Sequence, residues 1–354
     1  MNMQMRQIED LASFVRDLGS ECTTLNIEQN YLVAGSKLGR IKLWEINTGQ
    51  VKWSLDVDGP ISDLEIDEAI YLTASAELHA VNVESGGLEW SKNIEGPSDL
   101  IEIDKDIIFV TSSLYEIEIQ DYTESTLFKF NKKGELLESI DFEEKAWFMK
   151  KNNDEIILGI GRPRCGFLGI DNENKILHNQ TKGNSPVNMG IKTNTGFLLG
   201  HSDGTITEMN GKVCKYIQCG NDSITAMFST NISWQVGNSN GSLFSSEGWR
   251  VELGGKISSI VETEDYIWVS SISGNTIIHL LDRKNGSIKY QFSHNNEIQL
   301  MKLSHYNLAI SDEEGKIMFF DTRTLNKRIE AKSDLDQNID KRNLLKKRLR
   351  ALRE

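Results

Sequence analysis

The sequence predicts an all-β protein that is built from a repeated unit of four strands. Three observations support this prediction. Short runs such as residues 40–44 and 50–53 alternate polar and apolar side chains, which is typical of strands with one buried face. Gly, Asn, Asp and Ser supply the turns between these runs, and only four prolines occur in 354 residues. The pattern of residues 31–53 recurs as far as Ile329, with a period of about 38 residues.

Eight such units follow one another along the chain. A repeat of this length with four short strands is typical of a β-propeller blade, so we predict an eight-bladed β-propeller over residues 21–332. Seven blades is the alternative, if one unit is misread or if strands are shared at the closure. Each unit supplies four strands of its own, so we expect the ring to close by packing of the first blade against the eighth. The first strands of the units start near Cys22, Ile61, Asp99, Ala146, Val187, Ile224, Ile257 and Ile298.

A short helix is predicted ahead of the propeller, within residues 1–20. Apolar residues recur there at spacings of three and four, and Gly19 would end the helix. A single strand over residues 12–17 fits the same stretch and stays open as the alternative. The apolar residues are Ile8, Leu11, Val15 and Leu18.

A basic amphipathic helix is predicted after the propeller, over residues 333–354. This stretch lacks Gly and Pro, places leucines near one face, and carries seven Lys or Arg against four Asp or Glu. It could pair with a helix of a protein partner, bind nucleic-acid phosphates, or dock on an acidic propeller. We favour the protein partner. The candidate partner-binding residues in this segment are Leu345, Lys346, Lys347, Arg348, Leu349, Arg350 and Leu352.

Charge and hydropathy restrict the partners and the compartment. The net charge is −13 for the whole chain and −16 for residues 1–332, and such an acidic body repels the phosphate backbone. Nucleic acid could therefore bind only through the C-terminal helix. No run of 18 apolar residues predicts a membrane span, and charged residues interrupt any signal-peptide core near the N-terminus. The cytoplasm is the expected compartment.

The repeats resemble two propeller families. Gly35, Ser36, Gly39 and residues 40–44 resemble the second and third strands of a WD40 repeat, and residues 200–206 and 311–321 are similar. Residues 47–53 and 84–90 are more similar to the quinoprotein-type (PQQ-like) repeat, in which a turn glycine precedes a docking tryptophan. The resemblance covers roughly residues 22–332 and implies a propeller fold.

The sequence also departs from both families. The Gly-His start and Trp-Asp end of WD40 repeats are mostly missing, so their hydrogen-bonded tetrad is expected to be incomplete. Quinoprotein dehydrogenases carry an export signal, a vicinal cysteine pair and calcium ligands, whereas the cysteines here are scattered. The resemblance therefore does not imply redox activity. The four cysteines are Cys22, Cys165, Cys214 and Cys219.

Two irregular segments between second and third strands are the candidate partner-binding loops. They are Leu114–Ser125 in the third unit, which is acidic and carries Tyr115 and Tyr122, and Arg162–Gly166 in the fourth, which carries Arg162 and Arg164. Strand order places both on the same face of adjacent blades, so they should form one patch. Function tends to lie on such loops, although an insertion can also be a longer loop without a role.

No catalytic, cofactor-binding or metal-binding set can be identified. The six histidines are spread one per region, and no zinc-type Cys/His spacing occurs. The seven tryptophans mostly occupy strand positions and are expected in blade cores. The sequence thus favours a non-catalytic scaffold that binds one or more proteins. The alternative is a small-molecule-binding protein or quinoprotein-like enzyme that uses the central funnel.

Overall fold

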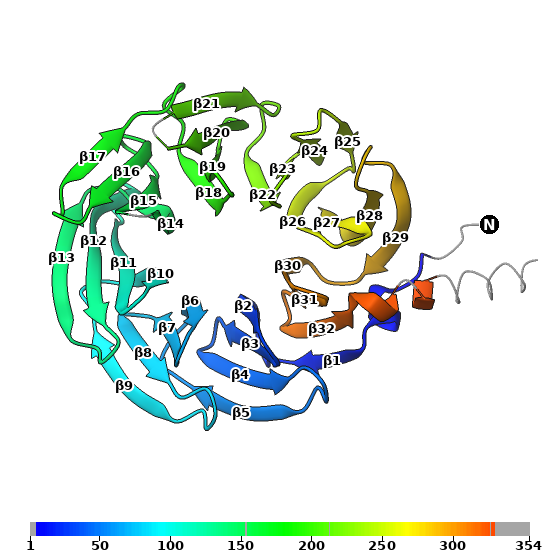
Figure 1. Cartoon of the computed structure of the whole chain (residues 1–354), viewed down its shortest axis with the longest axis horizontal. Coiled ribbons are helices and arrows are strands. Elements are labelled where there is room, and N and C mark those ends of the chain that lie inside the picture. Colours follow the sequence, from blue (N-terminus) through cyan, green and yellow to red (C-terminus); the bar gives the residue numbers. More distant parts are fainter. Residues whose placement is uncertain (1–4, 153, 212, 326, 330–354) are drawn as a thin grey trace, which may run out of the picture.

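The protein is an eight-bladed β-propeller, in which eight four-stranded antiparallel sheets surround a central channel (Figure 1). The computed structural model describes residues 5–152, 154–211, 213–325 and 327–329. The prediction of eight blades is confirmed, and the seven-bladed alternative is wrong. The C-terminal helix predicted for residues 333–354, with all of its candidate residues, lies outside the described residues.

Each blade has one strand at each of four radial positions. The inner strands of blades 1 to 8 are β2 (Cys22–Glu28), β6 (Ile61–Ile66), β10 (Ser98–Asp104), β14 (Ala146–Asn152), β18 (Val187–Lys192), β22 (Ile224–Ser229), β26 (Lys256–Glu262) and β30 (Ile298–Ser304). The second strands are β3 (Tyr31–Ser36), β7 (Ile70–Ala74), β11 (Ile107–Glu116), β15 (Glu155–Ile160), β19 (Gly196–His201), β23 (Trp234–Asn238), β27 (Tyr266–Ser273) and β31 (Asn307–Asp312). The third strands are β4 (Arg40–Glu45), β8 (Glu77–Val81), β12 (Asp121–Asn131), β16 (Gly166–Asp171), β20 (Thr205–Asn210), β24 (Ser242–Ser245), β28 (Asn275–Asp282) and β32 (Lys316–Asp321). The outer strands are β5 (Val51–Asp56), β9 (Leu88–Asn93), β13 (Leu136–Phe142), β17 (Ile176–Asn179), β21 (Val213–Gln218), β25 (Arg250–Glu252) and β29 (Ile288–His294) in blades 1 to 7, and β1 (Phe14–Asp17) in blade 8.

Every inner strand carries a bulge near its start, and the bulge ties neighbouring blades together. The register of all eight inner strands shifts at the equivalent place, as between Cys22 and Thr24 in β2. In several blades the side chain of the extra residue reaches the next blade. Thr23 donates from Oγ1 to the carbonyl oxygen of Ile61 at 2.6 Å. Thr225 donates in the same way to the carbonyl oxygen of Ile257, also at 2.6 Å.

The N-terminal segment closes the ring, which corrects two expectations. Residues 5–20 do not form the predicted helix: a 3-10 turn at Ile8–Leu11, η1, is followed by β1, close to the strand alternative over 12–17. Strand β1 pairs antiparallel with β32, so blade 8 takes its outer strand from the other end of the chain. Closure is therefore by hydrogen bonding and not by packing of complete blades. The ring of Phe14 stacks on Phe319 with centroids 4.7 Å apart.

The described part of the predicted last strand of the eighth unit is not a strand. Residues 322–325 and 327–329 are helical, and Leu325 and Ile329 bury their side chains against Ile8 and Leu11. Because β1 already occupies the free edge of β32, the chain after Asp321 has no edge left to pair with in this blade.

In four blades an aromatic ring in or next to the outer strand docks on a turn glycine of the next blade. The indole of Trp53 in β5 lies on Gly86, where a Cβ atom would come within 2.5 Å of the ring, and Trp53 Nε1 donates to the Val83 carbonyl oxygen at 2.8 Å. Gly86 has φ +70°, so both its conformation and its contact favour glycine. The equivalent pairs are Trp90 with Gly134, Trp249 with Gly286 and Phe14 with Gly49.

Antiparallel strand order gives the disc two different faces. We call the face with the links between blades and the hairpins between second and third strands the linker face. The turns between first and second and between third and fourth strands form the other face, the turn face. Both candidate loops, Leu114–Ser125 and Arg162–Gly166, lie on the linker face of blades 3 and 4.

Adjacent glycines give a matched test of the docking contact. We expect Gly86→Ala to lower the free energy of unfolding by about 2–4 kcal/mol, because alanine is strained at positive φ and its Cβ would displace the Trp53 indole. At Gly87 the Cβ would meet only the Ser85 hydroxyl oxygen, at 3.2 Å, so Gly87→Ala should change it by less than about 1 kcal/mol. Urea unfolding followed by tryptophan fluorescence measures both. Equal effects of the two variants would contradict the docking role.

Candidate interaction surface on the linker face

The β11–β12 hairpin extends far beyond its counterparts in other blades and presents apolar side chains at its tip. The two strands have 10 and 11 residues and stay paired up to Glu116 and Asp121. The segment expected to be an irregular loop is therefore largely strand. At the tip, Ile117 is 79% exposed and Ile119 is 61% exposed. Contiguous exposed apolar side chains of this kind mark interaction sites on soluble proteins.

An aromatic cluster stands beside this hairpin. The rings of Tyr115 and Tyr122 meet edge to face with centroids 5.1 Å apart, and Tyr122 meets Trp147 of β14 at 6.3 Å. The Nζ atom of Lys145 lies 4.6 Å from the Tyr122 centroid and 5.0 Å from that of Trp147, and it forms an ion pair with Asp99. The cluster is rigid, since the cation and rings hold one another.

The structure separates the two predicted arginines. Arg162 stays on the aromatic side, with Nε 3.4 Å from a carboxylate oxygen of Asp121 and with its side chain mostly exposed. Arg164 turns away and donates through Nε and Nη2 to both oxygens of Glu144, whose side chain is fully buried. Tyr115, Tyr122 and Arg162 thus line one hollow of about 400 Å³, whereas Arg164 serves mainly to neutralise a buried carboxylate.

A second hollow, which we call the acidic groove, lies on the other side of the hairpin. Its volume is about 610 Å³, and its apolar lining comes from Leu114, Phe142 and Ile176. Four carboxylates surround it, whereas Arg164 and His178 are the basic side chains in its wall. These carboxylates belong to Glu95, Glu124, Asp141 and Glu143.

The central channel has one charged side. Lys150 of β14 forms ion pairs with Glu65 of β6, at 3.1 Å, and with Glu102 of β10. Burial alone would lower the pKa of Lys150, but the two carboxylates outweigh it and raise that pKa above its ordinary value. Nearby, Asp63 accepts the backbone N–H of Ile101 at 3.1 Å, and burial raises the pKa of Asp63 to about 6.

The opposite side of the channel is apolar. The inner strands of blades 5 to 8 line a cavity of about 410 Å³ with three methionines and a phenylalanine, together with polar side chains such as Ser259 and Lys302. Flexible thioether side chains adapt to irregular apolar ligands. The apolar side chains include Met189, Met227, Phe228 and Met301.

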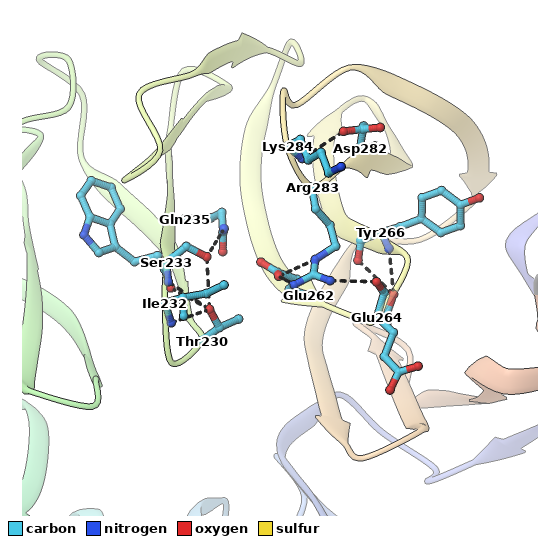
Figure 2. Close-up of polar contacts among 12 residues, drawn as sticks. Thr230, Ile232, Ser233, Gln235, Glu262, Glu264, Tyr266, Asp282, Arg283 and Lys284 are labelled. Atoms are coloured by element: carbon cyan, nitrogen blue, oxygen red, sulfur yellow. Dashed lines mark hydrogen bonds and ion pairs between the residues drawn. The ribbon is translucent and has the colours of Figure 1, made fainter.

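The turn face has a pocket of about 480 Å³ between blades 6 and 7 (Figure 2). Arg283 donates from Nε to the buried carboxylate of Glu262 at 2.7 Å and from Nη1 to the Glu264 carbonyl oxygen at 2.9 Å. On the facing wall Thr230 and Ser233 share a hydroxyl contact at 3.1 Å. The principal cation of this pocket is therefore already paired within the chain.

Most of the histidines and cysteines are buried in the blades. His294 Nε2 lies 2.9 Å from a carboxylate oxygen of Asp312 in blade 8, and both side chains are fully buried. Three other histidines contact hydroxyl groups, namely His79 with Ser91, His201 with Thr207 and His279 with Ser271. Burial lowers the pKa of His279 to about 4 and raises that of Cys22 to about 12. Within the described residues, no group of three or more His, Cys, Asp or Glu could hold a metal ion.

Trp147 and Lys145 belong to the surface but were not predicted from the sequence. Trp147 was expected in a blade core, yet it is 44% exposed because it is the bulge residue of β14. Alignment of the eight units could have identified it, since the bulge residue is polar in the seven other blades. Those residues are Thr23, Ser62, Asp99, Asn188, Thr225, Ser258 and Gln299.

Comparison with known proteins supports the fold and leaves the family open. No protein-family model matches the chain, and no curated protein matches it in sequence. The structure is similar to the computationally designed Ika8 protein, with TM-score 0.71, 14% identity, and coverage of 86% of this chain and 98% of that one. It is also similar to BamB from Moraxella catarrhalis (TM-score 0.69, 11% identity, 87% and 98% covered). Saccharomyces cerevisiae Sqt1 gives TM-score 0.71 and 10% identity, with 90% and 99% covered.

At these identities the likeness shows the fold alone. The propeller architecture is therefore confirmed, and the choice between WD40-like and quinoprotein-like repeats stays a prediction. In the part of the chain that the structure describes, no helix is both long and apolar enough to span a membrane.

The raised pKa of Asp63 gives a pH prediction. The Asp63 carboxyl titrates near pH 4 in an unfolded chain, so between about pH 4 and pH 6 the folded protein keeps a proton that the unfolded chain has released. Ionisation of this group therefore costs stability as the pH rises through that window. Ser259, at the equivalent place in blade 7, accepts the backbone N–H of Met301 at 3.0 Å.

Asp63→Ser copies that arrangement and removes the titrating group. We expect the free energy of unfolding of Asp63→Ser, relative to the wild type, to rise between about pH 4 and pH 6 and to level off on either side. Urea unfolding at a series of pH values measures this difference. A difference that does not change with pH would contradict the assignment.

Proposed function

We propose that this chain is a non-catalytic scaffold that binds one or more proteins through the linker face of blades 3 and 4. The observation that carries the proposal is the extended β11–β12 hairpin, whose tip exposes Ile117 and Ile119 beside the aromatic cluster of Tyr115, Tyr122 and Trp147. Aromatic and aliphatic anchors next to a polar rim are the usual composition of a protein interface.

Rigidity adds support to this assignment. The hairpin continues two strands of a closed propeller, and Lys145, between Asp99 and two aromatic rings, fixes the orientation of the cluster. An interface that is already ordered before binding loses less conformational entropy when the partner docks. The C-terminal segment, with Leu345, Leu349 and the basic residues between them, is the second partner-binding or assembly element of the proposal. We place the protein in the cytoplasm.

A second candidate function uses the central channel. Its apolar side, with Met227, Phe228 and Met301, faces charged residues such as Lys150 across the channel axis, an arrangement that suits a small amphipathic molecule. Native mass spectrometry of the protein purified from its host tests this candidate. An organic molecule retained at unit stoichiometry would favour it over the scaffold.

The hairpin tip and the turn face provide a matched pair for testing the scaffold. We expect the double variant Ile117→Ser, Ile119→Ser to lose a specific set of proteins that the wild-type chain retains in affinity purification from the native host. Ile232→Ser should retain that set, because Ile232 is 82% exposed on the turn face, away from the hairpin.

Truncation after Lys332 separates the two elements of the scaffold. Proteins lost only from the truncated chain would bind the C-terminal segment, and proteins lost only from the hairpin variant would bind the linker face. If the wild-type chain retains no specific protein, or if the hairpin variant retains every one of them, the assignment of partner binding to this surface is wrong.

A further inference from the structure

We propose that the acidic groove binds the basic C-terminal segment, residues 333–354, of a second copy of this chain. The inference deepens the proposed function and rests on it, since it names one partner of the linker face. It follows from the charge of the groove, its apolar lining, and the place where the described chain ends.

The carboxylates of the acidic groove have almost no cation of their own. Glu95, Glu124 and Asp141 make no ion pair within the described residues, and Asp141 only accepts a hydrogen bond from the Thr126 hydroxyl at 3.0 Å. Arg164 is the one arginine in the wall; it donates to both oxygens of the buried Glu144, and its Nε lies 3.8 Å from a carboxylate oxygen of Glu143. Three of the four groove carboxylates therefore remain without a cation from the described chain, and this negative charge attracts a basic segment.

Other hollows of the described surface differ in this respect. On the turn face of blades 3 and 4, Lys129 pairs with Glu138, and Lys151 lies over the ring of Phe109. Between blades 6 and 7, Arg283 pairs with Glu262 (Figure 2). Each of these hollows is lined by two or more lysines or arginines, whereas Arg164 is the one such residue in the lining of the acidic groove, so they would gain less from a basic ligand.

The groove also offers apolar contacts in the middle of its acidic rim. The side chain of Leu114 is 40% exposed, and Phe142 and Ile176 lie beside it in the lining. A ligand that fits must combine apolar residues with Lys or Arg on both sides of them. Residues 333–354 have this composition, with a net charge of +3 and leucines near one face of the predicted helix.

The C-terminal segment of a second copy can reach this groove more directly than the C-terminal segment of the same chain. The described chain ends near Ile329, which packs beside η1 after β32 has reached the turn face of blade 8. Blades 3 and 4 lie across the ring from blade 8 (Figure 1), and the groove opens on the linker face. To reach the groove of its own chain, the segment would have to pass around the edge of the disc from the turn face to the linker face. To reach the groove of another copy, it would not have to follow this path. The resulting contact is head to tail.

Two complementary variants test the proposal with full-length protein. The groove variant is Glu95→Lys with Glu124→Lys, and the tail variant replaces Lys346, Lys347, Arg348 and Arg350 with Glu. We expect the wild type to self-associate with increasing concentration in sedimentation velocity and to dissociate as salt rises. Each variant alone should associate about tenfold or more weakly, because reversal turns attraction into repulsion.

An equimolar mixture of the two variants should form a heterodimer, since the intact tail of one meets the intact groove of the other. The control variant, Glu28→Lys with Glu173→Lys, makes the same charge change at exposed turn-face positions and should associate as the wild type does. A wild type that is monomeric at every concentration, a groove variant that associates like the wild type, or a mixture that stays monomeric would overturn the proposal. In each of these cases loss of partners from the hairpin variant would still support the scaffold, so the two failures are distinguishable.

Discussion

The pairing of β1 with β32 is the interaction on which the rest of the molecule depends. A ring of separate sheets has no covalent closure, and without β1 the third strand of blade 8 would expose a free edge. The pairing joins residues that are about 300 positions apart in the chain, and η1 strengthens it by burying Ile8 and Leu11 between blades 7 and 8. This joint closes the ring and so fixes the order of the eight blades around it.

Two kinds of contact recur between neighbouring blades and hold them together. Near the channel, polar bulge residues of several inner strands reach the next blade, as Thr23 does toward Ile61 and Thr225 toward Ile257. At the outer edge, an aromatic ring docks on a turn glycine of the next blade, as Trp53 does on Gly86. Phe14 takes the tryptophan's place at the closure, so the same contact also seals the joint between blades 8 and 1. Because neighbouring blades contact one another both near the channel and at the outer edge, the long β11–β12 hairpin keeps its orientation relative to the disc.

Departures from the repeat mark the surface that we assign to partners. In blade 3 the second and third strands continue past the usual length, and in blade 4 a tryptophan replaces the polar bulge residue. Both changes add apolar surface at one place on the linker face, next to carboxylates such as Glu124 that no cation of the described chain neutralises. Neither change fills a blade core, because Ile117 and Ile119 are mostly exposed and Trp147 is 44% exposed beside Tyr122.

The sequence by itself determined the blade number, the start of each inner strand to within one residue, and the face shared by the two candidate loops. These features follow from local alternation and turn residues, and from a strand order that repeats. Only the tertiary structure decided that residues 14–17 form a strand, that Arg164 turns to Glu144, and that Trp147 joins Tyr122. Each of these depends on a partner brought near by the closed ring, and spacing along the chain does not encode such a partner.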